Sequence, residues 1–342
     1  MSSVVNSVEC SNIETGINLF NSYISRSINL SHCKVIVISE KLASRGISEY
    51  IYDLSNNVEV STHANIIITK CEANTFLKMT NPTIESFTAR YYQIVNTSSQ
   101  ITGYTKANSL ADFFCQYIDT CQEPSAVLAS INNDSTHSNT ASSSFTNKDS
   151  SYIAGQTPIT SSNNIENMGI AVFNNSKLVG ELNGMESICH LIMIGNLQYC
   201  NIQIKNPKGD DKQDITMRIK LRGNPKCNLH FVNGSPYIDV KVKLNAEIIS
   251  ASTGSSGYSS KDQIEKMEKE VNSYFEKIIT EYLYKMSKEY NSDIDGFGKY
   301  AIKYFNTKDE WDDYNWLKNF QNSFFNVNID SKIKSSTNFI NS

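Results

Sequence analysis

The stretch GIAVFNNSKLVGELNGMESICHLIMIG (Gly169–Gly195) decides the fold. Two apolar runs lie on either side of the polar tripeptide Asn174–Ser176, a pattern that predicts a β-hairpin. The run that follows, residues 185–195, has the apolar spacing of a helix. A hairpin followed directly by a helix predicts that sheet and helix pack together in this part of the chain.

Toward the C-terminus the sequence predicts an antiparallel sheet. In the last candidate strand Asp239, Lys241, Lys243 and Asn245 alternate with apolar residues, the period of a strand with one solvated face. The Asn-Gly pair at 233–234 predicts a tight hairpin turn before it. The predicted strands are 200–205, 215–222, 228–232 and 237–249.

A long amphipathic helix is predicted next, from Lys261 to Lys288. Ser260 and Gln263 have the spacing of a capping box, and apolar residues then recur every three or four positions. At 1.5 Å per residue this helix would be about 42 Å long. We favour packing across one face of the sheet over the alternative of a partner-binding coiled coil.

The N-terminal part predicts a βαβ unit. An apolar, β-branched run at 33–39 is typical of a buried strand, residues 40–54 suggest a helix interrupted near Gly46, and 60–70 is strand-like again. A helix at 12–25 precedes this unit. After residue 71 the apolar spacing is helical until a tract rich in Ser, Thr and Asn begins.

The predicted fold class is therefore α+β and multidomain, with mixed sheets, packed helices and a C-terminal antiparallel sheet that carries one long amphipathic helix. The predicted division is an α/β domain at 1–71 (incomplete at its N-terminus), a helical domain at 72–131, a Ser/Asn-rich linker at 132–164, and a β-sheet plus long helix domain at 165–342.

Charge and composition exclude several classes of protein. The 342 residues contain 31 Lys and Arg against 35 Asp and Glu, a formal net charge of −4. A general nucleic-acid binder needs a basic face, which this balance argues against, and the balance gives no support for binding an anionic membrane surface. No apolar stretch is long enough for a transmembrane helix, and residues 1–10 lack the features of a signal peptide. The chain as written is expected to be soluble.

No catalytic, cofactor-binding or metal-binding residues are predicted. The eight cysteines form no C-x-x-C pair and are interpreted as buried thiols. Cys189 and His190 are adjacent on a predicted helix, so their side chains diverge by roughly 100° and cannot act as nucleophile and base. Asp293 and Asp295 are interpreted as capping groups in preference to a cation site.

Three ordered motifs carry a family resemblance. Gly169–Ser187 resembles the hairpin-to-helix signature of the Ger(x)C family, the C subunits of bacterial spore germinant receptors. The sequence D-I-D-G-F-G (Asp293–Gly298), with Trp311, Trp316 and the strand 325–333 downstream, is similar to the family's C-terminal pattern. S-H-C-K-V-I-V-I-S-E (Ser31–Glu40) is similar to an N-terminal strand of the family.

The resemblance implies a non-catalytic scaffold at the outer face of the spore inner membrane, beside the membrane-embedded A and B subunits. Family members carry a lipid anchor, but Cys10 follows Val-Glu and lacks a lipobox, so no anchor is assigned to this chain. The residues predicted to form an interaction or structural motif are Gly169, Phe173, Gly180, Glu186, Gly296, Phe297, Gly298, Trp311 and Trp316.

The roles of two of these groups can be argued from residue type. Gly296 and Gly298 permit a tight turn while Phe297 enters the core. Trp311, Tyr314 and Trp316 are expected to be the apolar face of a terminal helix, with an exposed recognition platform as the alternative.

Two other functions remain open. An extracellular adhesion or glycan-binding module would display exposed aromatic residues in a concave sheet. A hydrolase could use a thiol or carboxylates that only the fold brings together, and its activity would be lost on Cys189→Ala.

Overall fold

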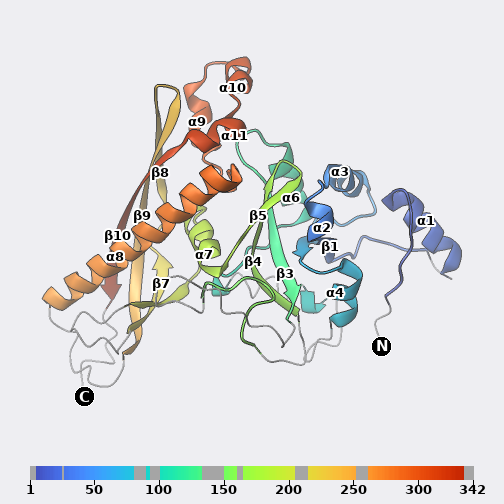
Figure 1. Cartoon of the computed structure of the whole chain (residues 1–342), viewed down its shortest axis with the longest axis horizontal. Coiled ribbons are helices and arrows are strands. Elements are labelled where there is room, and N and C mark those ends of the chain that lie inside the picture. The colour runs from blue at the N-terminus through green and yellow to red at the C-terminus, as the bar shows by residue number, and fades with distance from the viewer. Residues whose placement is uncertain are drawn as a thin grey trace.

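The computed structural model has two five-stranded sheets with helices packed on and between them, an α+β architecture as predicted (Figure 1). It describes residues 5–24, 27–80, 90–92, 101–132, 150–159, 165–204, 215–251 and 261–334. All structural statements below concern these ranges.

The first sheet has the strand order β1-β2-β3-β4-β5. Strands β1 and β2 pair in parallel, which confirms the predicted βαβ pairing, and β3 is parallel to β2. The hairpin β4–β5 then joins β3 in antiparallel pairing, as the apolar runs around Asn174–Ser176 indicated. The strands are β1 (Val35–Ser39), β2 (Asn65–Thr69), β3 (Ser125–Ile131), β4 (Ile165–Asn174) and β5 (Lys177–Leu182).

Short helices surround this sheet. Gly46, at φ +108°, separates α2 from α3 where the sequence predicted an interruption. Ser109 caps α6 by accepting from the backbone N–H of Asp112, and the α6 residue Phe113 packs edge to face on Phe173 with ring centroids 5.1 Å apart. The helices are α1 (Ile13–Tyr23), α2 (Glu40–Ala43), α3 (Ser48–Asn56), α4 (Ala73–Met79) and α6 (Leu110–Ile118).

The helical interpretation of 72–131 is wrong at its end, because residues 125–131 form strand β3. Six of the seven β3 residues are buried, and such a uniformly apolar run has no period that separates strand from helix. The first sheet therefore takes strands from three of the predicted segments. The division into domains itself stays a prediction.

Most of the predicted linker at 132–164 lies outside the described residues. Its described part comprises Asn132 and residues 150–159. The latter pack on the first sheet: Ala154 is buried, and its backbone N–H donates to the Met168 carbonyl at 3.0 Å. His137 also lies outside the described residues.

The second sheet has the order β10-β9-β7-β6, with β8 paired to the other end of β9. All of its pairs are antiparallel except β10 with β9, which is parallel because α8 forms the crossover between them. Asn233 and Gly234 both have positive φ in the β8–β9 turn, as predicted. The strands are β6 (Cys200–Ile204), β7 (Ile215–Leu221), β8 (Lys226–Val232), β9 (Ser235–Ala251) and β10 (Phe324–Lys334).

Helix α8 (Lys261–Tyr284) runs diagonally across the second sheet and continues as a π-helix, Lys285–Tyr290 (Figure 1). Its apolar face, which includes Met267, Val271 and Phe275, is buried in the same core as the inward side chains of β9. The predicted packing against the sheet is thus confirmed. The predicted cap, Ser260, lies outside the described residues.

The same helix also protects the free edge of β10. Three α8 side chains, each four residues after the last, accept backbone N–H groups of this strand: Glu268 Oε1 from Ile333 at 3.0 Å, Asn272 Oδ1 from Ser331 at 2.9 Å, and Glu276 Oε1 from Ile329 at 3.1 Å. Four helical residues rise about 6.0 Å and two strand residues about 6.6 Å, so the spacings match. An edge satisfied in this way is closed to a further strand.

Helix α7 (Gly184–Met193) connects the two halves. It contacts β4 and β5 on one side and α8 on the other, so one continuous core extends from Ile170 and Val172 of the first sheet to the second sheet. Short helices complete the C-terminal half: α9 (Gly298–Ala301), α10 (Lys308–Tyr314) and α11 (Trp316–Asn319). Among the described helices, none combines the length and apolarity needed to cross a bilayer.

Candidate functional site

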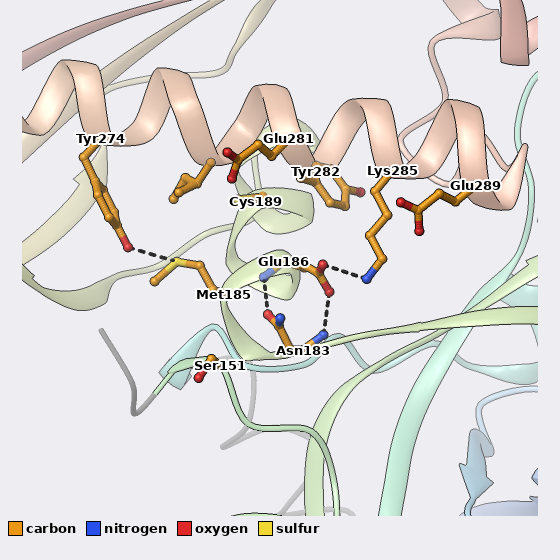
Figure 2. A pocket seen from close by; sticks show the side chains of 11 residues that line it. Ser151, Asn183, Met185, Glu186, Cys189, Tyr274, Glu281, Tyr282, Lys285 and Glu289 are labelled. Carbon is orange, nitrogen blue, oxygen red and sulfur yellow. Dashed lines mark hydrogen bonds and ion pairs between the residues drawn. The ribbon is translucent and has the colours of Figure 1, made fainter. Parts of the chain in front are cut away.

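An ion pair joins the start of α7 to the π-helix that continues α8. Asn183 caps α7 through the backbone N–H of Glu186, and the Glu186 carboxylate accepts the Asn183 N–H in return. The other oxygen of Glu186 lies 2.7 Å from Lys285 Nζ (Figure 2). The pair is about four-fifths buried, and it raises the pKa of Lys285 against the lowering effect of burial.

One turn further along α7, His190 is fully buried in a polar contact with α8 and the loop that follows. Its Nδ1 lies 2.8 Å from Asp295 Oδ1, and the Tyr282 hydroxyl donates to both oxygens of Asp295 at 3.1 and 3.0 Å. Three sequence segments, α7, α8 and the loop after the π-helix, therefore meet at one carboxyl group.

The protonation of this group follows from its burial. Burial, with Lys106 nearby, lowers the pKa of His190 well below its usual value. Burial raises the pKa of Asp295 to about 7, an effect that the Tyr282 hydrogen bond and the charge of Lys106 oppose. Burial likewise lowers the pKa of Lys106 to about 8. Above pH 7 the arrangement fits a neutral His190 that donates Nδ1–H to an ionised Asp295, with the charge of Lys106 nearby.

Two residues earlier, Asp293 is held in a nest of N–H donors. Its Oδ1 accepts from the backbone of Gly296 and Phe297 at 2.8 and 3.0 Å, and its Oδ2 accepts from Gly298 and from Trp316 Nε1 at 2.9 and 2.8 Å. Burial raises the pKa of Asp293 to about 7, while the bonds from Phe297, Trp316 and Gly298 lower it. Four donors and two oxygens make a complete set for a carboxylate.

The same loop is bonded to the β4–β5 hairpin, a contact that we call the hairpin–loop joint. Ser292 Oγ donates to the Phe173 carbonyl at 2.5 Å, and Asn174 Nδ2 donates to the Asn291 carbonyl at 2.7 Å. Glu123 bonds both segments: its backbone N–H donates to the Asp293 carbonyl of the loop, and its side-chain Oε2 accepts the Asn175 N–H of the hairpin. Burial raises the pKa of Glu123 to about 7.

Two of the predicted glycines allow close approach of other groups. A Cβ at Gly180 would lie 2.2 Å from the Tyr290 ring, so this glycine seats the end of the π-helix on β5. Gly169 has φ +97°, and a Cβ there would lie 2.2 Å from the Leu182 carbonyl.

The C-terminal predicted residues surround Asp293. Gly296 has φ +76° in the turn, and Phe297 is buried in the core. Trp311 and Trp316 are both buried and stack with ring centroids 6.1 Å apart. Their burial leaves no exposed platform built from these two rings. The hairpin–loop joint therefore bonds the Gly169–Ser187 motif to the residues just before Asp293–Gly298, and Glu123 bridges the two motifs.

A pocket of about 330 Å³ opens between α7 and α8 (Figure 2). It is lined by side chains of both helices and by Ser151, and its charged residues are Glu186, Glu281, Lys285 and Glu289. Cys189 contributes to its wall, but burial raises the pKa of this thiol well above its usual value.

Nucleophilic chemistry is not assembled here. Cys189 faces the pocket, whereas His190 bonds Asp295 on another side of α7, as their adjacent positions predicted. A protonated, buried thiol is a poor nucleophile. In the described part of the chain no three His, Cys, Asp or Glu residues come together as metal ligands.

His190, Tyr282 and Glu123 take part in buried polar contacts that no sequence motif predicts, and Lys106 adds a nearby charge that is equally unpredicted. A histidine within the apolar run ICHLIM is the available signal, because a buried imidazole requires a partner. Tyr282 lies in the apolar stripe of α8, a position typical of a core residue. The sequence around it does not predict that its hydroxyl bonds a carboxyl group from another segment. Nothing in the local sequence marks Lys106 or Glu123.

Comparisons with known proteins agree with this arrangement. Residues 168–337 match the family model "Spore germination B3/ GerAC like, C-terminal", and residues 1–132 match "Spore germination protein N-terminal domain". The chain is 22% identical over 315 residues to spore germination protein GerQC from Bacillus cereus, which covers 91% of this chain and 77% of that protein. The crystal structure of the GerBC protein superimposes with a TM-score of 0.57 at 17% identity, over 88% of this chain and 79% of that one.

The two family models lie on either side of the Ser/Asn tract. The C-terminal model covers every residue of the hairpin–loop joint except Glu123, which the N-terminal model includes. The predicted motifs, the fold and these matches lead to one conclusion: the chain belongs to the Ger(x)C family, whose members are the C subunits of spore germinant receptors.

Proposed function

We propose that this chain is the non-catalytic C subunit of a germinant receptor and is required for nutrient-triggered germination of spores. The observation that carries the proposal is the pair of spore-germination family matches, which together take in both halves of the fold. The similarity to GerQC, a spore germination protein, supports the same role.

The site geometry supports a scaffold in preference to an enzyme. Its buried polar groups are used to join segments: Asp293 holds its own loop, and Asp295 holds His190 and Tyr282. A hydrolase would need an activated nucleophile, and burial keeps the Cys189 thiol protonated. The residues of the two motifs thus serve to keep the two halves of the chain in one fixed arrangement.

In this proposal the partners are the A and B membrane subunits of the receptor, and the chain acts at the outer face of the spore inner membrane. A body whose two halves are joined by hydrogen bonds and an ion pair suits a subunit that holds others together. No cofactor, metal or nucleic acid takes part.

The test is deletion of the gene and complementation in spores. We expect deletion to abolish or strongly slow germination with the cognate nutrient, while the yield and heat resistance of the spores stay at the parental level. Complementation with the intact gene should restore the response. Nutrient-triggered germination at the parental rate in the deletion strain would overturn the proposal.

A further inference from the structure

The face of the second sheet that points away from α8 is strongly basic. Side chains alternate along each strand, so that β9 directs Val240, Val242 and Leu244 into the core and Lys241 and Lys243 to solvent. We call this solvent side the basic face. Its cationic residues are Arg218, Lys220, Arg222, Lys226, Lys241, Lys243, Lys332 and Lys334, and its carboxylates are Asp239, Glu247 and Asp330.

The charge of this face is opposite to that of the chain. Eight cations and three carboxylates give the face a net charge of +5, whereas the whole chain has −4. The numbers of acidic and basic residues are nearly equal in the whole chain, but the alternation of side chains along the strands places an excess of basic residues on this one face. The whole-chain charge gave no support for binding an anionic surface, but that argument does not hold for one face.

Most of this positive charge is uncompensated. Arg222 pairs with Asp330 at 2.6 Å, and Lys332 reaches Glu268 of α8 at 3.2 Å. The other five lysines have no carboxylate within ion-pair distance in the described part of the chain: Lys220, Lys226, Lys241, Lys243 and Lys334. They are all exposed, so their ammonium groups are available to a partner.

An aromatic row borders the lysines at the end of the sheet near the β8–β9 turn. His230, Tyr237 and Phe324 are direct cross-strand neighbours on β8, β9 and β10, and their rings stack with centroids 5.6 and 4.7 Å apart. Phe324 of this row and the nearby Val232 are each 42% exposed. Exposed apolar and aromatic groups next to lysines are the composition of a surface that meets a lipid interface.

We propose that the basic face docks on an anionic phospholipid bilayer. A broad sheet face suits a planar partner, and the lysines can bind lipid phosphates while their methylene stems and the aromatic row lie at the acyl boundary. The docking deepens the proposed role at a membrane, because it would fix the orientation of the chain on the surface. It rests on the charge separation and does not require the receptor assignment to hold.

The test uses the purified full chain and sedimentation with vesicles. We expect binding to vesicles of equal phosphatidylcholine and phosphatidylglycerol, weakening with added salt, and no binding to phosphatidylcholine alone. Each lysine near an anionic leaflet strengthens binding about fivefold, so Lys241→Gln with Lys243→Gln should weaken it roughly 25-fold. Both side chains are solvent-exposed, so the fold should be retained, which circular dichroism verifies.

The matched control is Lys266→Gln with Lys269→Gln on the exposed side of α8, which removes the same charge from another surface. The control should bind as the unaltered chain does. Equal losses in both double variants would mean binding by general charge and would overturn the proposal, as would no binding of the unaltered chain to anionic vesicles. Preferential binding to soluble polyglutamate or to an oligonucleotide would also overturn it, in favour of an acidic macromolecule.

Failure of this test and failure of the receptor role are distinguishable. Normal nutrient response in the deletion strain contradicts the receptor role and leaves vesicle binding as it was measured. Loss of vesicle selectivity contradicts the docking face alone.

Discussion

The ring of Tyr290 lies directly against Gly180: a Cβ on that glycine would be 2.2 Å from the ring carbon Cζ, and the Tyr290 hydroxyl donates to the neighbouring Glu181 carbonyl at 3.1 Å. This contact joins strand β5 of the first sheet to the π-helix that ends α8. It belongs to a set that includes the Glu186–Lys285 pair and the hairpin–loop joint, and together these contacts hold the two halves of the chain in register.

Gly180→Ala should destabilise the fold. Overpacking of this kind costs about 1–3 kcal/mol, because the ring is held by its hydrogen bond and cannot turn aside freely. In a Tyr290→Ala background the added methyl should cost almost nothing. Chemical denaturation of the four chains of this cycle measures the coupling, and equal costs of Gly180→Ala in both backgrounds would show that the ring is not what the glycine accommodates.

Asp293→Asn should be among the most damaging isosteric changes in the C-terminal half. An amide would turn an NH₂ group toward two of the four N–H donors, and losing hydrogen bonds to a charged acceptor costs about 1.5–3 kcal/mol each. Denaturation curves measure the loss. Asp313→Asn, on an exposed position of α10, is the control and should change stability little, and a similarly small effect of Asp293→Asn would contradict the nest.

Tyr282→Phe should destabilise the protein in a pH-dependent manner. The hydroxyl bonds the ionised form of Asp295, whose pKa burial raises to about 7, so its removal should cost most above pH 7 and little when the carboxyl group is protonated. Because this carboxyl keeps its proton longer in the folded than in the unfolded state, it lowers the free energy of unfolding as pH rises from about 4 to 7.

In Tyr282→Phe the pKa of Asp295 should rise further and extend that decline to higher pH. Tyr274→Phe on the same helix is the control, since its hydroxyl donates to Met185 Sδ at 3.8 Å, whereas that of Tyr282 donates to Asp295. Unfolding free energies measured across this pH range should separate the two variants. A constant difference between Tyr282→Phe and the unaltered chain at every pH would contradict the assigned protonation.

Removing the α8 side chains that protect β10 should promote self-association. Asn272→Ala with Glu276→Ala would leave two edge N–H groups of β10 without acceptors and open the strand to pairing with another copy. Sedimentation velocity over a range of concentrations should detect dimers or larger species. Glu265→Ala with Glu270→Ala, on the exposed side of α8, should stay as the unaltered chain does, and association in both variants would point to lost charge in place of an open edge.

Local pattern was sufficient to predict the hairpin around Asn174–Ser176, the Asn233–Gly234 turn, the βαβ unit and the long helix, because each depends on a short-range period or turn residue. Strand β3 was missed because a strand buried on both faces has no alternation. The parallel pairing of β10 depends on which edge of β9 is free after α8 crosses the sheet, which is a property of the whole fold.

In the candidate site, too, only the features that depend on local sequence could be predicted. The glycines at 296 and 298 were assigned to a turn on residue type, and Asp293 was expected to cap. The meeting of His190, Tyr282 and Asp295 could not be predicted, because the three lie in separate segments and only tertiary packing sets their distances. The basic face was hidden for a related reason: composition reports the sum of the charges and not the side of the sheet on which they lie.

Complementation of the deletion strain with Cys189→Ala distinguishes the proposed structural role in germination from a catalytic one. We predict nutrient-triggered germination at the rate given by the unaltered gene, at matched protein level in the spore, because burial keeps the thiol protonated and the adjacent His190 bonds Asp295. Loss of germination by Cys189→Ala in spores that contain the folded variant at that level would contradict the account.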